Sequence, residues 1–326
     1  MTGGAGFVGS NLARKLNALG HDLTIVDNLK YGYAHNLSGL DSARFIHSDL
    51  RDLNLVALIQ NMDAVFHFAG ISSLPECEAN PAEAFSVNTT LVASLLHAIR
   101  FSNVKRLIFS STSAVYENNT ETPFKESDPV SPDLIYSMTK LSAENLCKAY
   151  FQNYGVEAII CRFFNVYGPN QDFLRKFPPF TSYIVREILA ERVPVIYNSE
   201  PIARDYIFID DLVEILTKLM HHPDPIGGEI YNLCSNFTYT PVEILNTLSY
   251  LLKSKNDFVT GDPRKFWYKE ESLFESNYAL SESRITREVY KQSIGSNKKM
   301  LDHFEFVPTT TMESGLQRIL DFQKGT

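Results

Sequence analysis

The sequence lacks the features that point to a membrane or to a nucleic acid. It contains no run of about 18 or more apolar residues, which excludes a transmembrane helix. The first residues have neither a basic nor an apolar region, so we expect no secretory signal. Acidic residues outnumber basic ones by 38 to 30, a formal net charge of −8. The longest basic runs are pairs such as Arg175-Lys176, which we interpret as solvated surface, so nucleic-acid binding is not indicated.

Cysteine is also scarce. The chain has four cysteines, Cys77, Cys147, Cys161 and Cys234, and they are widely separated. This spacing argues against both a zinc site and a disulfide framework, and it is typical of a protein of the reducing cytoplasm. The eight histidines form no His-x-x-x-His pair, so we expect no metal.

The first half of the chain alternates short apolar runs with amphipathic stretches. At about 150 residues per domain, its 326 residues suggest two domains. Strands are predicted at 23–27, 64–68, 106–110 and 157–161, and helices at about 8–19, 81–99 and 136–150. The strands are apolar throughout, as expected for strands covered on both faces. The sequence therefore predicts an α/β fold with a doubly wound parallel sheet.

A glycine-rich segment, Thr2-Gly3-Gly4-Ala5-Gly6-Phe7-Val8-Gly9, opens the first predicted helix. Glycines at this place let backbone N–H groups approach a pyrophosphate at the positive end of the helix. Asp27 ends the next strand, where a carboxylate accepts hydrogen bonds from the adenosine ribose and repels a 2′-phosphate, which favours NAD over NADP. The alternative interpretation is a tight turn followed by an ordinary polar residue at a strand end.

The glycine segment should follow a strand, yet only Met1 and Thr2 precede Gly3. Without that strand, the buried backbone of the central strands would lose a hydrogen-bonded neighbour. We therefore expect the natural chain to begin several residues upstream, with a short apolar run.

Tyr136 and Lys140 form a Tyr-x-x-x-Lys pair on a predicted helix. Residues four apart share a helix face, so the phenol and the ammonium can point into one site. A nearby ammonium stabilises phenolate and lowers the pKa of the tyrosine. Ser110-Ser111-Thr112 ends a strand at the carboxyl edge of the sheet, where ligands bind in folds of this kind. A chance pair on the surface is the alternative.

These segments together resemble the extended short-chain dehydrogenase/reductase family, in its NAD-dependent branch of nucleotide-sugar epimerases and dehydratases, which includes enzymes like UDP-galactose 4-epimerase. Three further segments extend the resemblance: Phe68-Ala69-Gly70, 162–169 and 204–211. It covers residues 2 to about 235, and the remaining residues match only loosely.

The resemblance implies a division of the chain and a set of roles. An NAD-binding Rossmann domain would span 1–167, with a returning segment around 203–235, and a smaller mixed α/β substrate lobe would comprise 168–202 and 236–326. Tyr136 would be the acid/base, Lys140 would hold the nicotinamide ribose, and Thr112 would bind the reacting hydroxyl. The residues implied to bind the cofactor are Gly3, Gly6, Phe7, Val8, Gly9, Asp27, Asn28, Asp49, Leu50, Phe68, Ala69, Gly70, Asn88, Tyr136 and Lys140.

At the substrate end, Asn165 and Arg204 would bind the diphosphate, and Arg264 is the candidate for a second phosphate-binding arginine. The alternative for Asn165 is a loop cap, and for Arg204 it is a salt bridge with Asp205. Two apolar-faced helices, beginning near Pro81 and Tyr136, would pair with their symmetry mates, so the resemblance implies a homodimer.

The chain departs from this family after Thr112. Sugar 4,6-dehydratases carry Asp-Glu directly after the hydroxyl residue, and related decarboxylases carry Glu two positions after it, whereas this chain has Ser113 and Ala114. Elimination would lack its catalyst, so we predict a cytoplasmic nucleotide-sugar epimerase acting at C4 of a UDP-sugar with bound NAD. A dehydratase, decarboxylase or reductase on the same scaffold remains an alternative, as does a non-catalytic NAD-binding regulator or scaffold.

Overall fold

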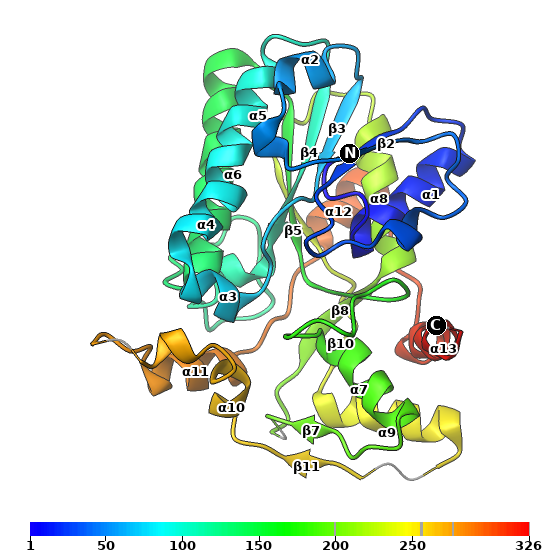
Figure 1. Cartoon of the computed structure of the whole chain (residues 1–326), viewed down its shortest axis with the longest axis vertical. Helices are drawn as coiled ribbons and strands as arrows, with labels where there is room; N and C mark the ends of the chain where they lie inside the picture. Colours follow the sequence, from blue (N-terminus) through cyan, green and yellow to red (C-terminus); the bar gives the residue numbers. More distant parts are fainter. Residues whose placement is uncertain (199, 255–256, 276, 326) are drawn as a thin grey trace.

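The computed structural model describes residues 1–198, 200–254, 257–275 and 277–325 (Figure 1). The strands are β1 (Thr24–Asp27), β2 (Arg44–His47), β3 (Ala64–His67), β4 (Arg106–Thr112), β5 (Ala158–Phe163), β6 (Asn165–Tyr167), β7 (Val195–Ile196), β8 (Arg204–Phe208), β9 (Ile230–Leu233), β10 (Thr238–Tyr239) and β11 (Val259–Thr260).

The helices are α1 (Phe7–Ala18), α2 (Leu55–Ile59), α3 (Leu74–Ala79), α4 (Pro81–Phe85), α5 (Leu91–Ile99), α6 (Ile135–Tyr154), α7 (Phe180–Leu189), α8 (Ile209–His221), α9 (Pro241–Leu252), α10 (Arg264–Trp267), α11 (Glu282–Val289), α12 (Lys298–Phe304) and α13 (Met312–Lys324). Short 3₁₀ turns cover Ala34–Leu37, Leu50–Asp52, Ser113–Tyr116 and Glu271–Leu273, and a π-helical turn covers Ser86–Thr90. Within the described residues, no helix combines the length and the apolar character needed to cross a bilayer.

The main sheet is parallel, in the strand order β3-β4-β5-β9, and β1 pairs with β2 in parallel beside it. Thr2 forms bridges to both Val26 and His67, so the segment before the glycine loop lies between β1 and β3 and joins the two sets of strands. The predicted doubly wound parallel sheet is confirmed, and the strands predicted at 23–27, 64–68, 106–110 and 157–161 coincide with β1, β3, β4 and β5.

Helices cover both faces of this sheet because its strands are apolar on both faces. Along β4, Leu107 and Phe109 pack into the core under α5 and α6, whereas Ile108 between them packs into the core under α1 and α8. All three side chains are fully buried. Figure 1 shows the two layers, with α5 and α6 on one side of the sheet and α1 and α8 on the other.

Local chemistry sets the start of the helical segment that holds Asn88 and the end of the helix that holds Tyr136 and Lys140. Asn80 caps α4 by accepting a hydrogen bond from the Glu83 amide, and Pro81 takes the first helical position. From there α4, the π-helical turn and α5 run on to Ile99, which agrees with the predicted helix at 81–99. The end of α6 falls at Gly155, whose φ of 69° suits glycine.

The smaller lobe lies at one end of the sheet (Figure 1). Its strands β10, β8 and β6 form a small mixed sheet, β7 pairs with β11, and α13 packs against α7 and α9. Within 203–235, β9 pairs with β5 of the main sheet, whereas β8 pairs with β6 and β10 of the small sheet. By contrast, α12 packs against β9 although it falls in the range 236–326 assigned to the lobe.

Candidate active site

A cleft of about 600 Å³ brings together the carboxyl ends of the sheet strands, the glycine loop and parts of the smaller lobe. Candidate residues from every predicted group line it: Gly3, Gly6, Phe7, Val8, Gly9, Phe68, Gly70, Thr112, Tyr136, Lys140, Asn165 and Arg204. A smaller pocket adjoins it and is lined by other candidates: Asp27, Asn28, Asp49, Leu50 and Ala69. Segments far apart in the sequence therefore meet in one place.

The glycine loop leaves room for a ligand because side chains are missing where the backbone is crowded. Gly3 has φ +65°, and a Cβ there would lie 2.6 Å from the Ala69 amide nitrogen. A Cβ on Gly9 would lie 2.5 Å from the Gly3 carbonyl oxygen. Helix α1 starts directly after Gly6, which has no side chain to cap it, so first-turn N–H groups are available to an anion. This cradle fits the pyrophosphate of a dinucleotide.

The carboxylate of Asp27 braces the loop and also faces the smaller pocket. Its Oδ2 accepts a hydrogen bond from the Ala5 amide at 2.9 Å, and its Oδ1 accepts one from the Leu29 amide at 2.8 Å. A carboxylate has about four acceptor sites, so further acceptance from ribose hydroxyls is possible. The residues present therefore fit an adenosine ribose next to the glycine cradle.

Arg51 is a part of this pocket that the sequence interpretation missed. Its guanidinium lies 2.9 Å from both Asp49 and Glu83. Hydrogen bonding from Arg51 lowers the pKa of Asp49 to about 2. Only the i+2 spacing of Asp49 and Arg51 hinted at this pairing, and the partner Glu83 is distant in sequence.

Asn88 connects the cleft wall to the helix of the Tyr-Lys pair. It lies in the π-helical turn, a feature that often marks functional sites. Its side chain accepts from the Ile71 amide at 2.9 Å, and donates to the Ile71 carbonyl at 3.0 Å and to Thr139 Oγ1 at 3.1 Å. Gly70 adjoins it, since a Cβ there would lie 3.0 Å from Asn88 Oδ1 and 3.5 Å from Lys140 Nζ. In this structure Asn88 fixes the wall segment beside Lys140.

Tyr136 and Lys140 share the buried face of α6, as their spacing predicts, and Thr112 ends β4 next to them. Burial raises the pKa of Tyr136 to about 12, against a lowering effect of its hydrogen bond with Thr112. Lys140 Nζ donates to the Ser110 carbonyl at 2.8 Å, and burial lowers its pKa to about 8. The phenol of Tyr136, the hydroxyl of Thr112 and the ammonium of Lys140 are therefore buried together in this part of the cleft.

Arg175 also belongs to the cleft, which corrects the interpretation of this residue as solvated surface, whereas its neighbour Lys176 is exposed as expected. Its Nε donates to the Phe177 carbonyl at 2.7 Å, and its Nη1 to Ser72 Oγ at 3.4 Å. Burial and Cys77 raise the pKa of Tyr136, whereas the Thr112 hydrogen bond and the charge of Arg175 lower it. Sequence spacing gave no signal for it, because 39 residues and a loop separate Arg175 from Tyr136.

At the far end of the cleft, Asn165 and Arg204 come from the neighbouring strands β6 and β8. Asn165 Nδ2 donates to the Asp205 carbonyl at 2.7 Å, and Arg204 Nη2 donates to the Glu288 carbonyl at 3.1 Å. The Asp205 side chain is fully buried and accepts from the amides of Ser235 and Asn236. Successive strand residues point to opposite faces, so the alternative of an Arg204–Asp205 salt bridge is not supported.

Arg264 does not join this group. Among the described residues, those that line the cleft do not include it, and its guanidinium pairs at 2.6 Å with Asp262 and at 3.0 Å with Glu282. These local carboxylates neutralise it on the surface of α10. The cleft instead has Lys291, whose Nζ lies 2.7 Å from Glu288, and Ser293, both missed from the sequence.

The two positions after Thr112 also line the cleft. Ser113 Oγ accepts a hydrogen bond from Ser293 Oγ at 3.4 Å, and the Ala114 amide donates to Thr112 Oγ1 at 3.1 Å. The wall beside Thr112 therefore presents a hydroxyl and a methyl group to the cleft.

Comparison with known proteins gives this arrangement a context. The family model of the NAD dependent epimerase/dehydratase family matches residues 1–234. A UDP-glucose 4-epimerase of Lacticaseibacillus casei is 31% identical to this chain, in a match that covers 75% of this chain and 78% of the relative. A dTDP-D-glucose 4,6-dehydratase of Mus musculus is 30% identical, in a match that covers 78% of this chain and 73% of the relative. A solved UDP-N-acetylglucosamine 4-epimerase from Methanobrevibacter ruminantium, in complex with UDP-N-acetylmuramic acid, superposes with a TM-score of 0.86 at 27% identity, over 99% of this chain and 97% of that one. The chain belongs to the NAD dependent epimerase/dehydratase family.

Proposed function

We propose that this protein is a nucleotide-sugar epimerase that inverts C4 of a UDP-sugar and uses bound NAD. The observation that carries the proposal is the group of Thr112, Tyr136 and Lys140 beside Ser113 and Ala114. This group contains a phenol that can act as acid and base and a hydroxyl that can bind the reacting sugar hydroxyl. Both are needed to oxidise and then reduce a single carbon. It has no carboxylate at the two positions where family members with other reactions place one.

The glycine cradle and Asp27 would hold the cofactor, which supplies a hydride acceptor when bound. The residues proposed to contact it line the two pockets: Gly3, Gly6, Phe7, Val8, Gly9, Asp27, Asn28, Asp49, Leu50, Phe68, Ala69, Gly70, Tyr136 and Lys140. Asn88 is buried behind this lining and would support the cofactor site through its hydrogen bonds to Ile71. Asp27 favours NAD over NADP because its charge would repel a 2′-phosphate.

In this proposal Tyr136 Oη takes the proton of the C4 hydroxyl and later returns it. Thr112 orients that hydroxyl through its own side chain. Burial is the main influence that holds the proton on Tyr136, so a cation must favour the phenolate when the proton moves. Among the residues that the structure describes, Lys140 and Arg175 are the cations that line this end of the cleft.

Asn165, Arg204 and Lys291 would bind the diphosphate of the substrate. Arg204 and Lys291 bring positive charge to the same stretch of the cleft, and a guanidinium can bind a phosphate with two parallel hydrogen bonds. UDP is the favoured nucleotide because the related epimerases named above act on UDP-sugars.

A 4,6-dehydratase is the second candidate, since one of the relatives is such an enzyme. It is disfavoured by the chemistry beside Thr112. Elimination needs an acid and a base near C5 and C6, and the serine hydroxyl and alanine methyl at positions 113 and 114 cannot serve as that pair.

The reaction outcome tests the proposal. Incubation with UDP-hexoses and UDP-hexuronic acids should give a pair of C4 epimers at equilibrium for at least one substrate, without net NADH. Nuclear magnetic resonance of the products distinguishes the epimers. Accumulation of a 4-keto-6-deoxy sugar, or release of carbon dioxide, would refute the epimerase assignment.

A control on the same preparation concerns the cofactor. Denaturing the purified protein should release NAD rather than NADP, since the cofactor is regenerated in each turnover. Recovery of mainly NADP would overturn the role given to Asp27.

We also propose that the protein is a cytoplasmic homodimer. Cys77, Cys147, Cys161 and Cys234, all within the described residues, are unpaired and buried, in keeping with a reducing compartment. The dimer would form through α4, α5 and α6, where Met138 is 42% exposed.

A further inference from the structure

The helix that carries Tyr136 begins without a cap of its own. Helix α6 starts at Ile135, and its N-cap residue is Leu134, whose side chain has no hydrogen-bonding atom. The first amides of a helix have no partner within the helix and need acceptors from elsewhere. Tyr136 is the second residue of α6, so whatever satisfies these amides also sets the position of its backbone.

Glu117, from a distant part of the chain, accepts hydrogen bonds from the N-cap amide, from the amide before it and from a side chain of the first turn. Its Oε1 accepts from the amides of Asp133 at 2.6 Å and Leu134 at 2.8 Å, and its Oε2 accepts from Ser137 Oγ at 2.8 Å. Glu117 directly follows the 3₁₀ turn that begins after Thr112. One carboxylate therefore connects the Thr112 segment to the start of α6.

Glu78 of α3 adds a second carboxylate at the same helix end. Its Oε1 accepts from the Ile135 amide at 2.6 Å. Negative charge is favourable at the positive end of a helix dipole, so both carboxylates stabilise this start beyond their hydrogen bonds. Burial raises the pKa of Glu78. Glu117 is the carboxylate of this pair that forms a salt bridge with a buried cation.

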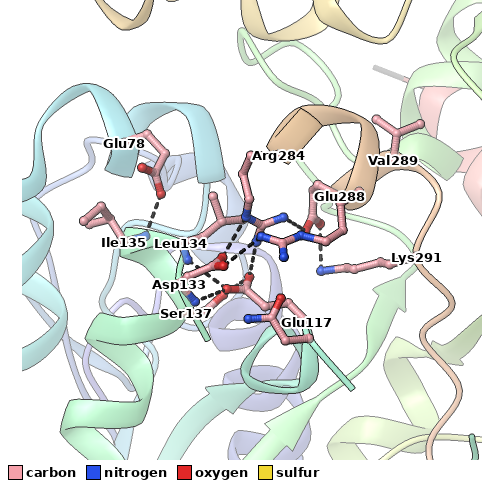
Figure 2. A network of polar contacts seen from close by, with 12 residues as sticks. Glu78, Glu117, Asp133, Leu134, Ile135, Ser137, Arg284, Glu288, Val289 and Lys291 are labelled. Carbon is pink, nitrogen blue, oxygen red and sulfur yellow. Dashed lines mark hydrogen bonds and ion pairs between the residues drawn. The ribbon is translucent and has the colours of Figure 1, made fainter. Parts of the chain in front are cut away.

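That cation is Arg284 of α11, shown at the centre of the network in Figure 2. Its Nη2 lies 2.9 Å from Glu117 Oε2, and its Nε lies 2.8 Å from Asp133 Oδ1. The Glu117 side chain is fully buried, and that of Arg284 is 9% exposed. A buried carboxylate that loses its cation is strongly destabilised, so Arg284 holds Glu117 in its capping position.

The other end of α11 reaches the proposed diphosphate contacts. The carbonyls of Glu288 and Val289 accept from Arg204 Nη2, at 3.1 and 3.4 Å. Glu288 also pairs with Lys291 at 2.7 Å and lies 3.8 Å from Arg284 Nη1. Helix α11 thus connects the cap of α6 to the residues proposed to bind the diphosphate.

We propose that Arg284 is a positioning residue for Tyr136, which acts by holding Glu117 as the cap of α6. The inference rests on the proposed function, in which Tyr136 is the acid/base. Arg284 lies outside the cleft lining among the described residues, so its effect reaches the reaction through the backbone of α6.

The test replaces Arg284 with methionine in the full chain. In Arg284→Met, kcat on the epimerised UDP-sugar should fall about 10- to 100-fold, the cost of a small misplacement of a catalytic group, whereas KM should change far less. Hydrogen–deuterium exchange of a peptide covering 132–141 should become faster. The NAD content after purification should stay the same.

Arg287→Met is the matched control. Arg287 lies on the same helix and pairs with the same Asp133, at 2.7 Å, but its side chain is 49% exposed. Its replacement should leave kcat within about twofold and exchange at 132–141 unchanged, as is usual for an exposed ion pair. Equal losses in the two variants would overturn the proposal.

A double variant provides the rescue. Glu117→Gln combined with Arg284→Met removes both buried charges, while the amide oxygen can still accept from Leu134. We expect kcat to recover most of the loss seen in Arg284→Met, and no recovery would overturn the proposal. If Arg284→Met does not fold, Arg284→Lys keeps the charge, and its kcat should lie between wild type and the loss expected for methionine.

Failure of this inference differs from failure of the proposed function. Unchanged kcat and unchanged exchange at 132–141 in a folded Arg284→Met would overturn the positioning role alone. A wild-type chain that epimerises no UDP-sugar would refute the proposed function and, with it, the role of Arg284 toward a catalytic Tyr136. In that case faster hydrogen–deuterium exchange at 132–141 in Arg284→Met would still show that Arg284 stabilises the start of α6.

Discussion

Burial shifts the pKa values of Tyr136 and Lys140 in opposite directions. The pKa of the phenol rises to about 12, and that of the ammonium falls to about 8, because an enclosed site disfavours either charge. The neutral phenol is therefore the resting form near pH 7. In the proposed reaction, proton transfer to and from Tyr136 depends on the hydroxyl of Thr112 and on the cations that line the cleft beside it.

The variant Tyr136→Phe tests this residue directly. It removes the proposed proton carrier and keeps the ring, so stability should hold and kcat should fall about 10²- to 10⁴-fold, the usual range for general acid–base catalysis. Steady-state kinetics and thermal unfolding measure the two effects. Turnover close to wild type would mean that another group moves the proton.

Asp205 offers a pH test at a single residue. Burial raises its pKa to about 6 from 3.8, against the lowering effect of hydrogen bonds from Ser235 and Asn236. Between about pH 4 and 6 the folded chain keeps a proton that the unfolded chain has lost, so the contribution of Asp205 to stability falls as the pH rises through this window.

The comparison with Asp205→Asn isolates that contribution, because asparagine does not titrate. The Tm advantage of the wild type over the variant should be largest near pH 4 and should shrink toward pH 6. A difference that is constant across this range would show that Asp205 keeps an ordinary pKa.

At the scale of elements, the sequence predicted what local periodicity determines. The strands at 23–27, 64–68, 106–110 and 157–161 follow from apolar runs, and the helix from Pro81 follows from its Asn-Pro start. The pairing of Tyr136 and Lys140 on one face follows from helical spacing, since i and i+4 are neighbours on any α-helix.

Local periodicity did not predict the elements after about residue 240. These elements form much of the far wall of the cleft, so that wall was not predicted either. Arg264 was chosen for its position in the chain, but nearby Asp262 and Glu282 bind it. Arg175 and Arg284 act on partners 39 or more residues away in the chain, and no periodic pattern encodes contacts of that kind. Lys291 pairs with Glu288, three residues before it, but only the folded chain places that pair in the cleft.

At the scale of the whole molecule, the proposed dimer depends on what α4, α5 and α6 leave exposed. Leu91 and Leu95 are buried in the core of this chain, so they are not available to a partner. Phe85, Leu141 and Phe151 are only half-buried, and Met138 is exposed. The contact would therefore use a narrower apolar strip than the sequence indicated.

Sedimentation measures this assembly. The chain should behave as a dimer at micromolar concentrations, and Met138→Glu, which places a charge on the strip, should shift it toward monomer. A wild-type monomer at every concentration would defeat the homodimer proposal.

The path of the chain between the sheet and the lobe has a consequence for protein engineering. After β5 the chain enters the lobe, returns for α8 and β9, goes back for α9, returns again for α12 against β9, and ends in the lobe with α13. Substrate preference therefore cannot be transplanted between relatives by exchanging one continuous cassette. A functional chimera needs several junctions chosen together, and a single cut before α12 removes material from both parts at once.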